Sequence, residues 1–378
     1  MIYLDHSATH LIPAEVLSIY LRLLREENFN PAARYAPARK LRTAIDRAKK
    51  EIMELLAARQ AELIFTSGAS ESINLCLKGM AEAYPHRPKR IITSELEHAA
   101  TREALAELAR RGYEITVIES KHGKPDPKSL EKALERPALA LSLIHVQNEF
   151  GGVLELKNLA SLAKSIQPQI KIHIDAVQSI GRIPFSFSEL KIDAASFSGH
   201  KFGSPKGIGY LLFDQKLLLN AQIHGGGHQN NLRSGTENYP LVGASLAALR
   251  LAVSDLEAKT QRVTELRDFF INELRAQNIE FKQIEQAGAV VPHILSLEFP
   301  GLRAEALMTA LSEEEIYVSI GSACSSNKIE EMGSYAAYGL SQDAAKHLLR
   351  FSINAENTEA ELRQCASSIA AILAQFKV

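Results

Sequence analysis

The sequence predicts an α/β fold in which a large domain with a mostly parallel sheet is followed by a smaller C-terminal domain. Three observations predict it. Short, nearly continuous apolar runs alternate with helical patterns from about residue 62 to 210, which is typical of strands buried on both faces of a parallel sheet. The pattern changes near Val253 to a long charged helix. The chain of 378 residues, 46% of them hydrophobic, is also too long for one compact unit.

The elements follow in order from the hydrophobic patterns. Residues 1 to about 20 predict an extended entry and a helix, and apolar residues at helical spacing predict a second helix over 39–56. The strands of the sheet are expected at 63–65, 90–92, 115–118, 139–144, 170–174 and 193–197. The helices that cover it are expected after Gly68, Glu97, Pro127 and Glu155. The C-terminal domain is expected to hold strands at 294–297 and 349–353 and a closing helix at 358–376.

The composition argues against several classes of protein. A formal net charge of -1 gives no excess of positive charge with which to bind nucleic acid or a membrane surface. Three sparse cysteines indicate a reducing compartment rather than a disulfide framework. The first residues lack a basic-then-apolar signal pattern, and the longest apolar run, at 138–146, is too short to span a bilayer. We therefore expect a soluble, cytoplasmic protein.

The segment 196–203 organises the functional interpretation. An apolar strand ends there, and Lys201 follows on a turn with Ser198 and His200. A lysine held between buried strands loses solvation, which disfavours its ammonium form and leaves a nucleophilic amine. Such amines form Schiff bases with carbonyls, most commonly with pyridoxal phosphate, whose phosphate Ser198 and His200 would contact. A surface lysine in a hairpin turn is the alternative for this segment alone.

Other polar residues stand where predicted strands end, which is the edge at which open α/β sheets bind ligands. The stretch 66–72 combines a glycine with a helix start, so it is a candidate phosphate site to which Ser70 adds a hydroxyl. His98 is placed to stack on a planar cofactor and to move protons. An ordinary helix cap is the alternative for the first segment, and a structural hydrogen bond is the alternative for His98.

Two further strand ends and one C-terminal strand carry polar residues. Asn148 offers both a donor and an acceptor near the sheet edge. Asp175 ends an apolar strand and needs a partner, which a pyridinium nitrogen would supply, and Gln178 would reach the phenolic oxygen of the same ring. Arg350 lies on an apolar strand and needs an anion, either a substrate carboxylate or an internal salt bridge.

The last candidates are a glycine-rich segment and the cysteines. The glycine run at 224–229 suggests backbone that wraps a ligand or a subunit neighbour, and its two histidines lack a third metal ligand nearby. Cys324 stands among small residues, which suits a mobile nucleophile, although an inert loop thiol is the alternative. Cys76 and Cys365 lie in apolar helical patterns and are expected in the core.

Taken together, these segments resemble the cysteine desulfurases of the NifS/IscS type, which are pyridoxal-phosphate enzymes of the class V aminotransferase family. The similarity keeps the order of the motifs along nearly the whole chain, at 3–5, 66–72, 97–98, 146–150, 175–179, 196–201, 233–238, 321–326 and 350–352. It implies the aspartate-aminotransferase-like fold (fold type I). A large domain at 15–252 would carry a mostly parallel seven-stranded sheet, and a smaller α+β domain at 1–14 and 253–378 would carry a mobile cysteine loop at about 321–334.

The resemblance also implies a role for each candidate. Lys201 holds the cofactor and moves the proton at Cα, while Cys324 attacks the substrate sulfur, so that L-cysteine becomes L-alanine and the enzyme a persulfide. Arg350 binds the substrate carboxylate with help from Asn148. The remaining cofactor contacts are Ala69, Ser70, Ser198 and His200 at the phosphate, His98 over the ring, Asp175 at the pyridine nitrogen, and Asn148 and Gln178 at the phenolate.

Partners follow from the same resemblance. Thr236 is expected to reach the phosphate in the neighbouring subunit, which implies a homodimer with shared sites. The persulfide sulfur would pass to an iron–sulfur scaffold or another acceptor protein. The resemblance allows Cys324 to ligate an iron–sulfur cluster transiently, and no resident metal is expected.

Three segments, 6–10, 30–38 and 330–335, depart from the family pattern, and they bear on the substrate entrance, the cysteine loop and the sulfur acceptor. Alternatives on the same fold are a selenocysteine lyase, a sulfinate-releasing enzyme and an aminotransferase. Cys324 favours the desulfurase, because those reactions do not all need a thiol nucleophile. A catalytically degenerate binding module is the alternative of another class, against which the retained Lys201 weighs.

Overall fold

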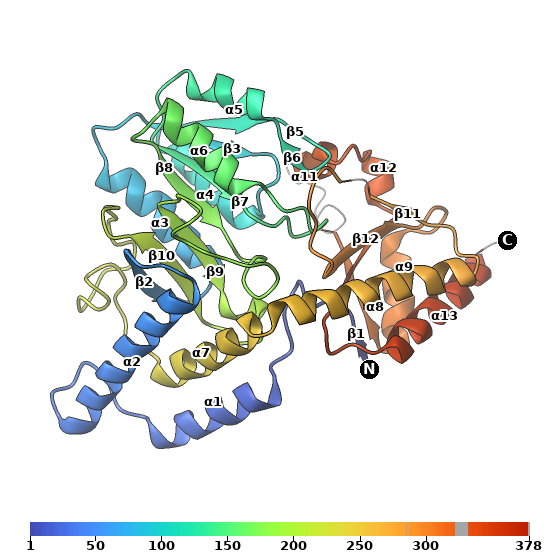
Figure 1. Ribbon diagram of the computed structural model, residues 1–378, viewed down its shortest axis with the longest axis horizontal. Helices are drawn as coiled ribbons and strands as arrows, with labels where there is room; N and C mark the ends of the chain where they lie inside the picture. The colour runs from blue at the N-terminus through green and yellow to red at the C-terminus, as the bar shows by residue number, and fades with distance from the viewer. Residues whose placement is uncertain (285, 322–331, 377–378) are drawn as a thin grey trace.

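The computed structural model describes the chain except residues 285, 322–331 and 377–378, and it is built around one seven-stranded sheet (Figure 1). The strands, in their order across the sheet, are β2 (Ala61–Thr66), β10 (Gly209–Asp214), β9 (Ala194–Ser198), β8 (Lys171–Asp175), β7 (Ala140–Ile144), β3 (Arg90–Ser94) and β4 (Glu114–Ile118). Every pair is parallel except the two made by β10. The predicted mostly parallel sheet is therefore confirmed, with β10 as its one antiparallel strand.

Helices cover both faces of this sheet, which is why its strands read as continuous apolar runs. In β2, Leu63 and Phe65 belong to one hydrophobic cluster and Ile64 to the other, as the period of two requires. The helices over the first face are α2 (Ala36–Leu55), α5 (Pro127–Leu134), α6 (Leu156–Ile166) and α7 (Tyr239–Val253). Those over the second are α3 (Ala69–Ala83) and α4 (Ala99–Arg110). The outermost, α1 (Ala14–Glu26), packs on α7.

Local sequence sets several helix starts. The predicted helix over 39–56 begins three residues earlier, at Ala36, because Pro37 suits the first turn of a helix, where its missing N–H is not needed. The helix α5 begins in the same way at Pro127, and the Asp126 side chain caps it by accepting from the N–H of Lys128.

A third hydrophobic cluster lies outside this sheet. It combines residues of the N-terminal strand with residues from 263 onward, including Leu4, Phe270 and Phe351. Its antiparallel sheet has the order β11 (Lys282–Gln283), β12 (Ile294–Glu298), β15 (Leu348–Ser352) and β14 (Ser319–Ile320). The helices that cover it are α8 (Leu256–Ala276), α9 (Ala304–Glu313) and α13 (Glu359–Phe376).

The N-terminus crosses between the two parts of the fold. The strand β1 (Ile2–Tyr3) pairs in parallel with β13 (Ile316–Tyr317), and Asp5 forms a bridge with Ser352. The chain then passes over the end of β9, where His10 N–H donates to the carbonyl of His200 at 2.8 Å. Residues 5–10 therefore cover the edge of the large sheet, next to the turn that carries Lys201.

The remaining elements are short connections. They are the hairpin β5 (Ser120–Lys121) and β6 (Lys124–Pro125), the 3-10 turn η1 (Gly199–Lys201), α11 (Met332–Ala337) and α12 (Gln342–Ala345). Cys76 and Cys365 are free thiols with no exposed surface, as predicted, and burial raises the pKa of both. Across the described part of the chain, no helix is both long and apolar enough to cross a bilayer.

Candidate active site

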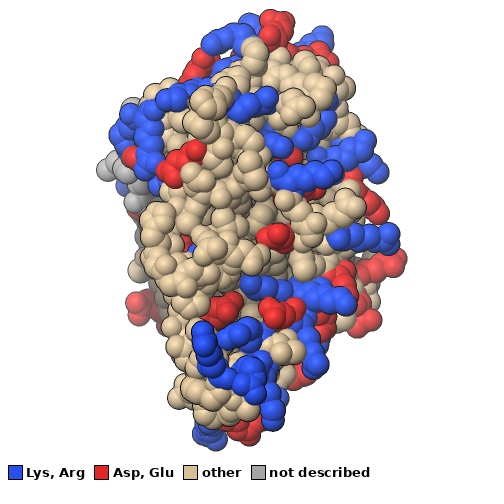
Figure 2. All heavy atoms as spheres, turned by 90° about the vertical axis from the view of Figure 1, so that its left-hand side faces the viewer, with Lys and Arg blue, Asp and Glu red and all other residues tan. Residues whose placement is uncertain are grey.

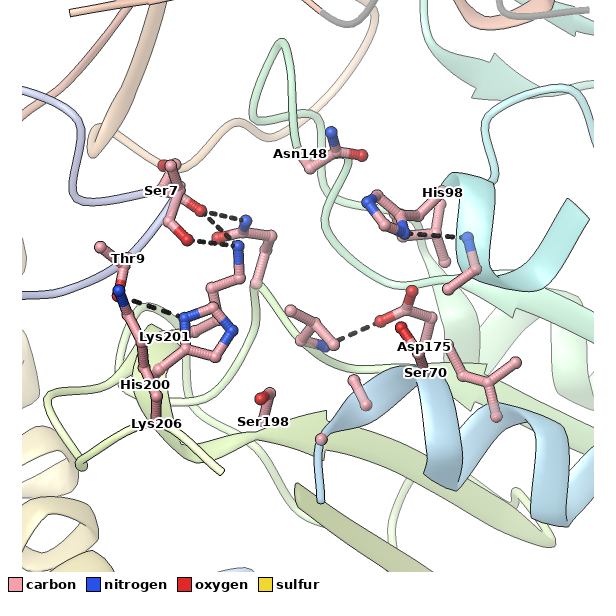
Figure 3. A pocket seen from close by; sticks show the side chains of 18 of the residues that line it. Ser7, Thr9, Ser70, His98, Asn148, Asp175, Ser198, His200, Lys201 and Lys206 are labelled. Carbon is pink, nitrogen blue, oxygen red and sulfur yellow. Dashed lines mark hydrogen bonds between the residues drawn. The ribbon is translucent and has the colours of Figure 1, made fainter. Parts of the chain in front are cut away.

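A cavity of about 680 Å³ opens at the carboxyl ends of β7, β8 and β9, beside the start of α3 (Figure 3). It brings together ten of the residues predicted from the sequence. These are Ala69, Ser70, His98, Asn148, Asp175, Gln178, Ser198, His200, Lys201 and Arg350. Two predicted residues are not among them. Thr236 is exposed and does not line the cavity, and Cys324 lies outside the described residues.

Lys201 ends the turn η1 that follows β9, and its side chain reaches under the N-terminal segment. Its Nζ donates to the carbonyl oxygens of Ser7 at 2.8 Å and Ala8 at 2.9 Å. Burial, with the positive charges of Arg182 and Arg350, lowers the pKa of Lys201 to about 8. About a tenth of the amine is therefore unprotonated at pH 7, far more than for an ordinary lysine, and the unprotonated amine is the nucleophilic form.

Asp175 is the last residue of β8 and is 2% exposed. Its Oδ1 accepts from the N–H of Val177 at 3.0 Å, and no basic side chain of the described residues lies within 4 Å of it. Burial raises the pKa of Asp175 to about 6. The positive charge of Lys201 opposes this rise, and a cationic group of a ligand close to Asp175 would stabilise its carboxylate further.

His98 and the residue before it form the next wall. His98 caps α4, where its Nδ1 accepts from the N–H of Ala100 at 3.1 Å, and its ring faces the cavity above Asp175 (Figure 3). Glu97 is buried beneath and accepts from the Ser94 hydroxyl at 2.6 Å and from the N–H of Ile144 at 2.9 Å. Burial raises the pKa of Glu97 to about 8, so this carboxyl retains its proton at neutral pH and fixes the loop that carries His98.

The opposite end of the cavity is suited to an anion. Backbone N–H groups at the start of α3 face it, and Ser70 and Ser198 add hydroxyls. A Cβ at Gly209 would lie 2.3 Å from the carbonyl carbon of Gly68, so only glycine lets β10 approach this loop closely. Lys206 also lines this end, although sequence reasoning missed it because a turn lysine has no distinctive pattern.

His200 stands at the same end in its neutral form. Its Nδ1 lies 3.2 Å from the hydroxyl of Thr9. Burial, with the charges of Lys201 and Lys206, lowers the pKa of His200 to about 4. A neutral imidazole has only one N–H, so it contributes a hydrogen bond rather than a charge.

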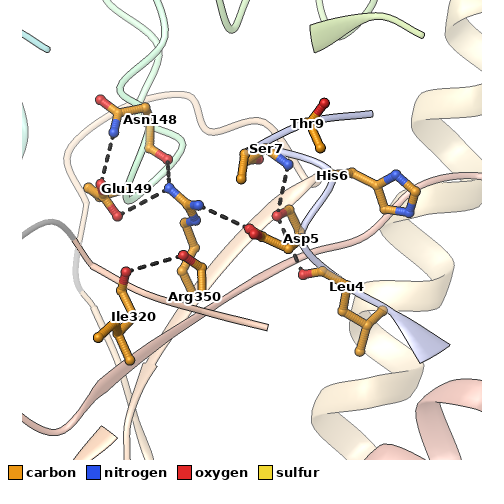
Figure 4. A network of polar contacts seen from close by, with 12 residues as sticks. Leu4, Asp5, His6, Ser7, Thr9, Asn148, Glu149, Ile320 and Arg350 are labelled. Carbon is orange, nitrogen blue, oxygen red and sulfur yellow. Dashed lines mark hydrogen bonds and ion pairs between the residues drawn. The ribbon is translucent and has the colours of Figure 1, made fainter. Parts of the chain in front are cut away.

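Arg350 lies between two carboxylates at the far side of the cavity (Figure 4). Its Nη2 is 3.1 Å from Asp5 Oδ1, and its Nη1 is 3.3 Å from Glu149 Oε2 and donates to the carbonyl of Asn148 at 3.1 Å. The internal salt bridge left open by the sequence is thus formed. Its Nε is buried and has no hydrogen-bond partner among the described residues, while the side chain as a whole lines the cavity.

Gln178 and Asn148 are held by neighbours that the sequence did not indicate. The Nε2 of Gln178 donates to the Ser7 carbonyl at 3.0 Å, and its Oε1 accepts from Arg182. The Nδ2 of Asn148 donates to Glu149 at 2.9 Å. These contacts join positions up to 171 residues apart, which no local pattern reveals.

The glycine-rich segment 224–238 lies apart from the cavity. It is fixed on the edge of the large sheet, because Gln229 accepts from the N–H of Phe65 at 2.7 Å and donates to its carbonyl at 2.8 Å, and Arg233 forms an ion pair with Glu71 at 2.8 Å. Within the described residues, no group of three or more His, Cys, Asp and Glu side chains is arranged to hold a metal ion.

Comparison with known proteins agrees with this geometry. The family described as Aminotransferase class-V matches residues 2–365. A protein named cysteine desulfurase IscS from Dictyoglomus turgidum is 34% identical over 377 residues, covering 100% of this chain and 95% of the relative. Its namesake from Ectopseudomonas mendocina is 36% identical over 375 residues, covering 97% and 91%. A solved structure titled NifS-like protein superposes with a TM-score of 0.92 at 30% identity, covering 99% of both chains.

Proposed function

The chain belongs to the aminotransferase class-V family, and from this membership we propose that it is a pyridoxal-phosphate-dependent cysteine desulfurase. It converts L-cysteine to L-alanine and holds the sulfur as a persulfide. The observation that carries the proposal is the full-length similarity to proteins named cysteine desulfurase, joined to a half-buried Lys201 that shares its cavity with the acid at the end of β8. The resemblance inferred from the sequence is thereby confirmed.

The donor set of the cavity fits pyridoxal phosphate. Asp175 is a buried carboxylate without a cationic partner within 4 Å among the described residues, and a protonated pyridine nitrogen supplies that partner. The start of α3, Ser198 and Lys206 would hold the phosphate, and Lys201 would hold the aldehyde carbon. When bound, the cofactor withdraws electrons from Cα of the substrate and so allows its Cβ–S bond to break.

The residues of the chain bind the substrate and move its protons. Arg350 lines the cavity and would bind the carboxylate of cysteine through guanidinium N–H groups that Asp5, Glu149 and the carbonyl of Asn148 do not occupy. Lys201, with its lowered pKa, would remove the proton from Cα and return a proton as alanine forms. His98 lines the wall of the cavity above Asp175, where it would lie over the cofactor ring and assist those proton transfers.

The sulfur step belongs to Cys324 in this proposal. Its thiolate attacks the substrate sulfur, an S–S bond forms as the Cβ–S bond breaks, and Cβ gains a proton before alanine leaves. The persulfide sulfur would then pass to an iron–sulfur scaffold or another acceptor protein. A reducing compartment such as the cytoplasm suits this chemistry, in keeping with three sparse cysteines.

We also propose the homodimer and the domain division that the sequence suggested. Figure 2 shows a broad uncharged area on the face that it presents, and on α1 the side chains of Leu17, Leu21 and Leu24 are exposed. Thr236 is exposed and outside its own cavity, which suits a contact with the phosphate of a neighbouring subunit. The hydrophobic cluster that joins residues 2–4 to residues 263–372 supports a large domain at 15–252 and a small domain at 1–14 and 253–378, although Tyr335, Tyr338 and Leu348 pack in the cluster of the large sheet.

The decisive experiment compares wild type with Cys324→Ala under anaerobic conditions. L-cysteine is supplied to the purified yellow protein, and alanine and protein-bound persulfide are quantified. We expect both products from wild type and neither from Cys324→Ala. Cys365→Ala is the matched control, because that thiol is fully buried and its loss should leave both products unchanged.

Other outcomes would redirect the proposal. Alanine from Cys324→Ala would show that this thiol is not the nucleophile, and selenocysteine or cysteine sulfinate would then be tested as substrates. No alanine from cofactor-loaded wild type, with or without a reductant that removes persulfide, would favour the degenerate binding module.

A further inference from the structure

A second cavity, of about 250 Å³, lies on the other side of Lys201 from the cofactor pocket. Its walls come from the N-terminal segment, the loop after β8, the end of α7 with the start of α8, and the segment after β15. Its basic lining residues are His6, His10, Arg182, Lys201, Lys259 and His293. The one acidic residue in the lining is Glu356, which is exposed. The proposed desulfurase reaction uses none of these groups except Lys201.

Arg182 is the central residue of this cavity. It is 6% exposed, and it donates to Gln178 Oε1 and to the carbonyl of His6 at 3.4 Å. No carboxylate of the described residues lies within 4 Å of its guanidinium. Burial and the nearby Arg350 lower the pKa of Arg182 to about 9. A buried guanidinium without a counter-charge is unfavourable, so an anion in the cavity would stabilise it.

Two histidines of the lining have unused hydrogen-bonding capacity. The Nδ1 atoms of His6 and His293 are buried and have no partner among the described residues. The side chains are 5% and 7% exposed, and burial lowers the pKa of both to about 3, so they are neutral. His6 points away from the Arg350 network in Figure 4. His10 differs, because its Nε2 already lies 3.0 Å from Asn354 Nδ2.

The lysines of the lining are held mainly by backbone oxygens. Lys259 contacts the carbonyl of Leu251 and lies 3.4 Å from the Ser254 hydroxyl, while Lys201 donates to the two carbonyls described above. Neither forms an ion pair with a carboxylate among the described residues. The cavity therefore combines three cationic side chains, neutral imidazoles and a single carboxylate at its exposed edge.

We propose that this cavity binds a small inorganic oxyanion of the size of sulfate. The planar guanidinium of Arg182 presents paired N–H donors that match two oxygens of such an anion, which a spherical halide does not offer. A volume of about 250 Å³ holds a sulfate-sized ion together with water. Two of the lining residues, His6 and His10, lie in the segment 6–10, whose sequence departs from the pattern of the family.

The charge of the bound anion would change the electrostatics of the cofactor pocket. Arg182 donates to Gln178, and Lys201 lines both cavities. A negative charge behind Lys201 opposes the two arginines that lower its pKa, so oxyanion binding should raise that pKa. The anion would thus adjust the protonation of the amine from outside the substrate path. This inference is independent of the desulfurase assignment, because it concerns binding to the folded chain.

The test measures binding rather than turnover. Sulfate is titrated calorimetrically into the holoenzyme in an oxyanion-free buffer, with sodium chloride at equal ionic strength and acetate as comparison salts. We expect saturable binding of sulfate to wild type. The affinity should be about tenfold lower, or lower still, in Arg182→Gln, because that variant loses one charged hydrogen-bonding group. His293→Leu should weaken it less. His86→Gln, an exposed histidine outside the cavity, should bind like wild type.

Crystals soaked in selenate provide the second measurement. An anomalous peak within hydrogen-bonding distance of Arg182 would place the anion and would not depend on any variant that fails to fold. Selenate found only on the surface, or equal responses to sulfate and chloride, would overturn the proposal. Stronger binding of acetate than of sulfate would overturn the inorganic oxyanion and point to an organic carboxylate. Unchanged sulfate affinity in both cavity variants would overturn the role of Arg182 and His293.

Discussion

Arg350 and Arg182 are two guanidinium groups that are each 6% exposed and that each lower the pKa of Lys201, yet their surroundings are opposite. Arg350 lies between Asp5 and Glu149, whose charges raise its pKa. Arg182 has only neutral acceptors among the described residues, and burial lowers its pKa. The same side chain, equally buried, is therefore neutralised by the fold in one region and left without a counter-charge in the other.

This difference in surroundings makes Arg350 part of a structural ion pair, whereas Arg182 would form an ion pair only with a ligand. Around Arg350 the chain supplies the anions, so the network is formed before any substrate enters. Around Arg182 the chain supplies donors without anions, so the favourable state requires a ligand. Lys201 lies between the two regions and responds to both. The following predictions test this contrast, beginning with the largest expected effect.

Arg350→Met should destabilise the protein most. It leaves the carboxylates of Asp5 and Glu149 without their partner, which costs about 3–5 kcal/mol for a buried pair. Urea unfolding measures the change without adding ions. Arg250→Met is the matched control, since its pair with Glu51 is exposed and should contribute less than about 1 kcal/mol. Equal losses in the two variants would contradict the contrast.

Asp175 should make the stability of the cofactor-free protein depend on pH. Its folded pKa is raised to about 6 from 3.8, so its favourable contribution is present below about pH 4 and is lost as the pH rises through 6. Relative to Asp175→Asn, the free energy of unfolding of wild type should fall by roughly 2–3 kcal/mol over that interval. Unfolding in urea at several pH values measures it, and parallel profiles for the two proteins would refute the prediction.

Arg182→Met should have a small effect of the opposite sign. Without oxyanions, the wild-type guanidinium is a buried charge that only neutral groups contact, so its removal should leave the free energy of unfolding unchanged or raise it by about 1 kcal/mol. Saturating sulfate should stabilise wild type more than Arg182→Met and so reverse the order of the two proteins. A loss as large as that of Arg350→Met would mean that Arg182 already has an internal partner.

The smallest expected effect concerns Lys201 itself. Cofactor uptake by the apo-protein needs the free amine, so its rate should rise with pH and reach half its maximum near pH 8. Saturating sulfate should move this midpoint upward by roughly 0.5 to 1 pH unit, the size expected for one charge at intermediate distance. Visible absorption follows the uptake. A midpoint that chloride moves equally would indicate general salt screening instead.

Much of the fold and the candidate site was predictable because their determinants are local. The strand at 171–175 carries Ile172 and Ile174 and is almost wholly buried because both faces of the sheet are covered, and the acid that ends it, Asp175, lies at the cavity as expected. Lys201, His98 and the start of α3 were found for the same reason. Each follows a strand, and the carboxyl ends of parallel strands meet at one edge.

The partners of these residues were not predictable in the same way. Arg350 pairs with Asp5 across 345 positions, and Glu149 looked like a polar turn residue beside Asn148. Lys206 carried no signal beyond a turn. A sequence pattern records which face of an element is buried, but it does not record which charges meet when two distant elements pack.

The sequence by itself determined the family, the parallel sheet and the residues at its carboxyl edge, because periodicity and strand-end chemistry are read from neighbours along the chain. Only the tertiary structure decided where charge is balanced. It placed residues 5–10 over Lys201, supplied Arg350 with two carboxylates, and left Arg182 among His6, His293 and Gln178. The physical reason is that the stability of a buried charge depends on groups within a few ångströms in space, and the fold brings those groups from opposite ends of the chain.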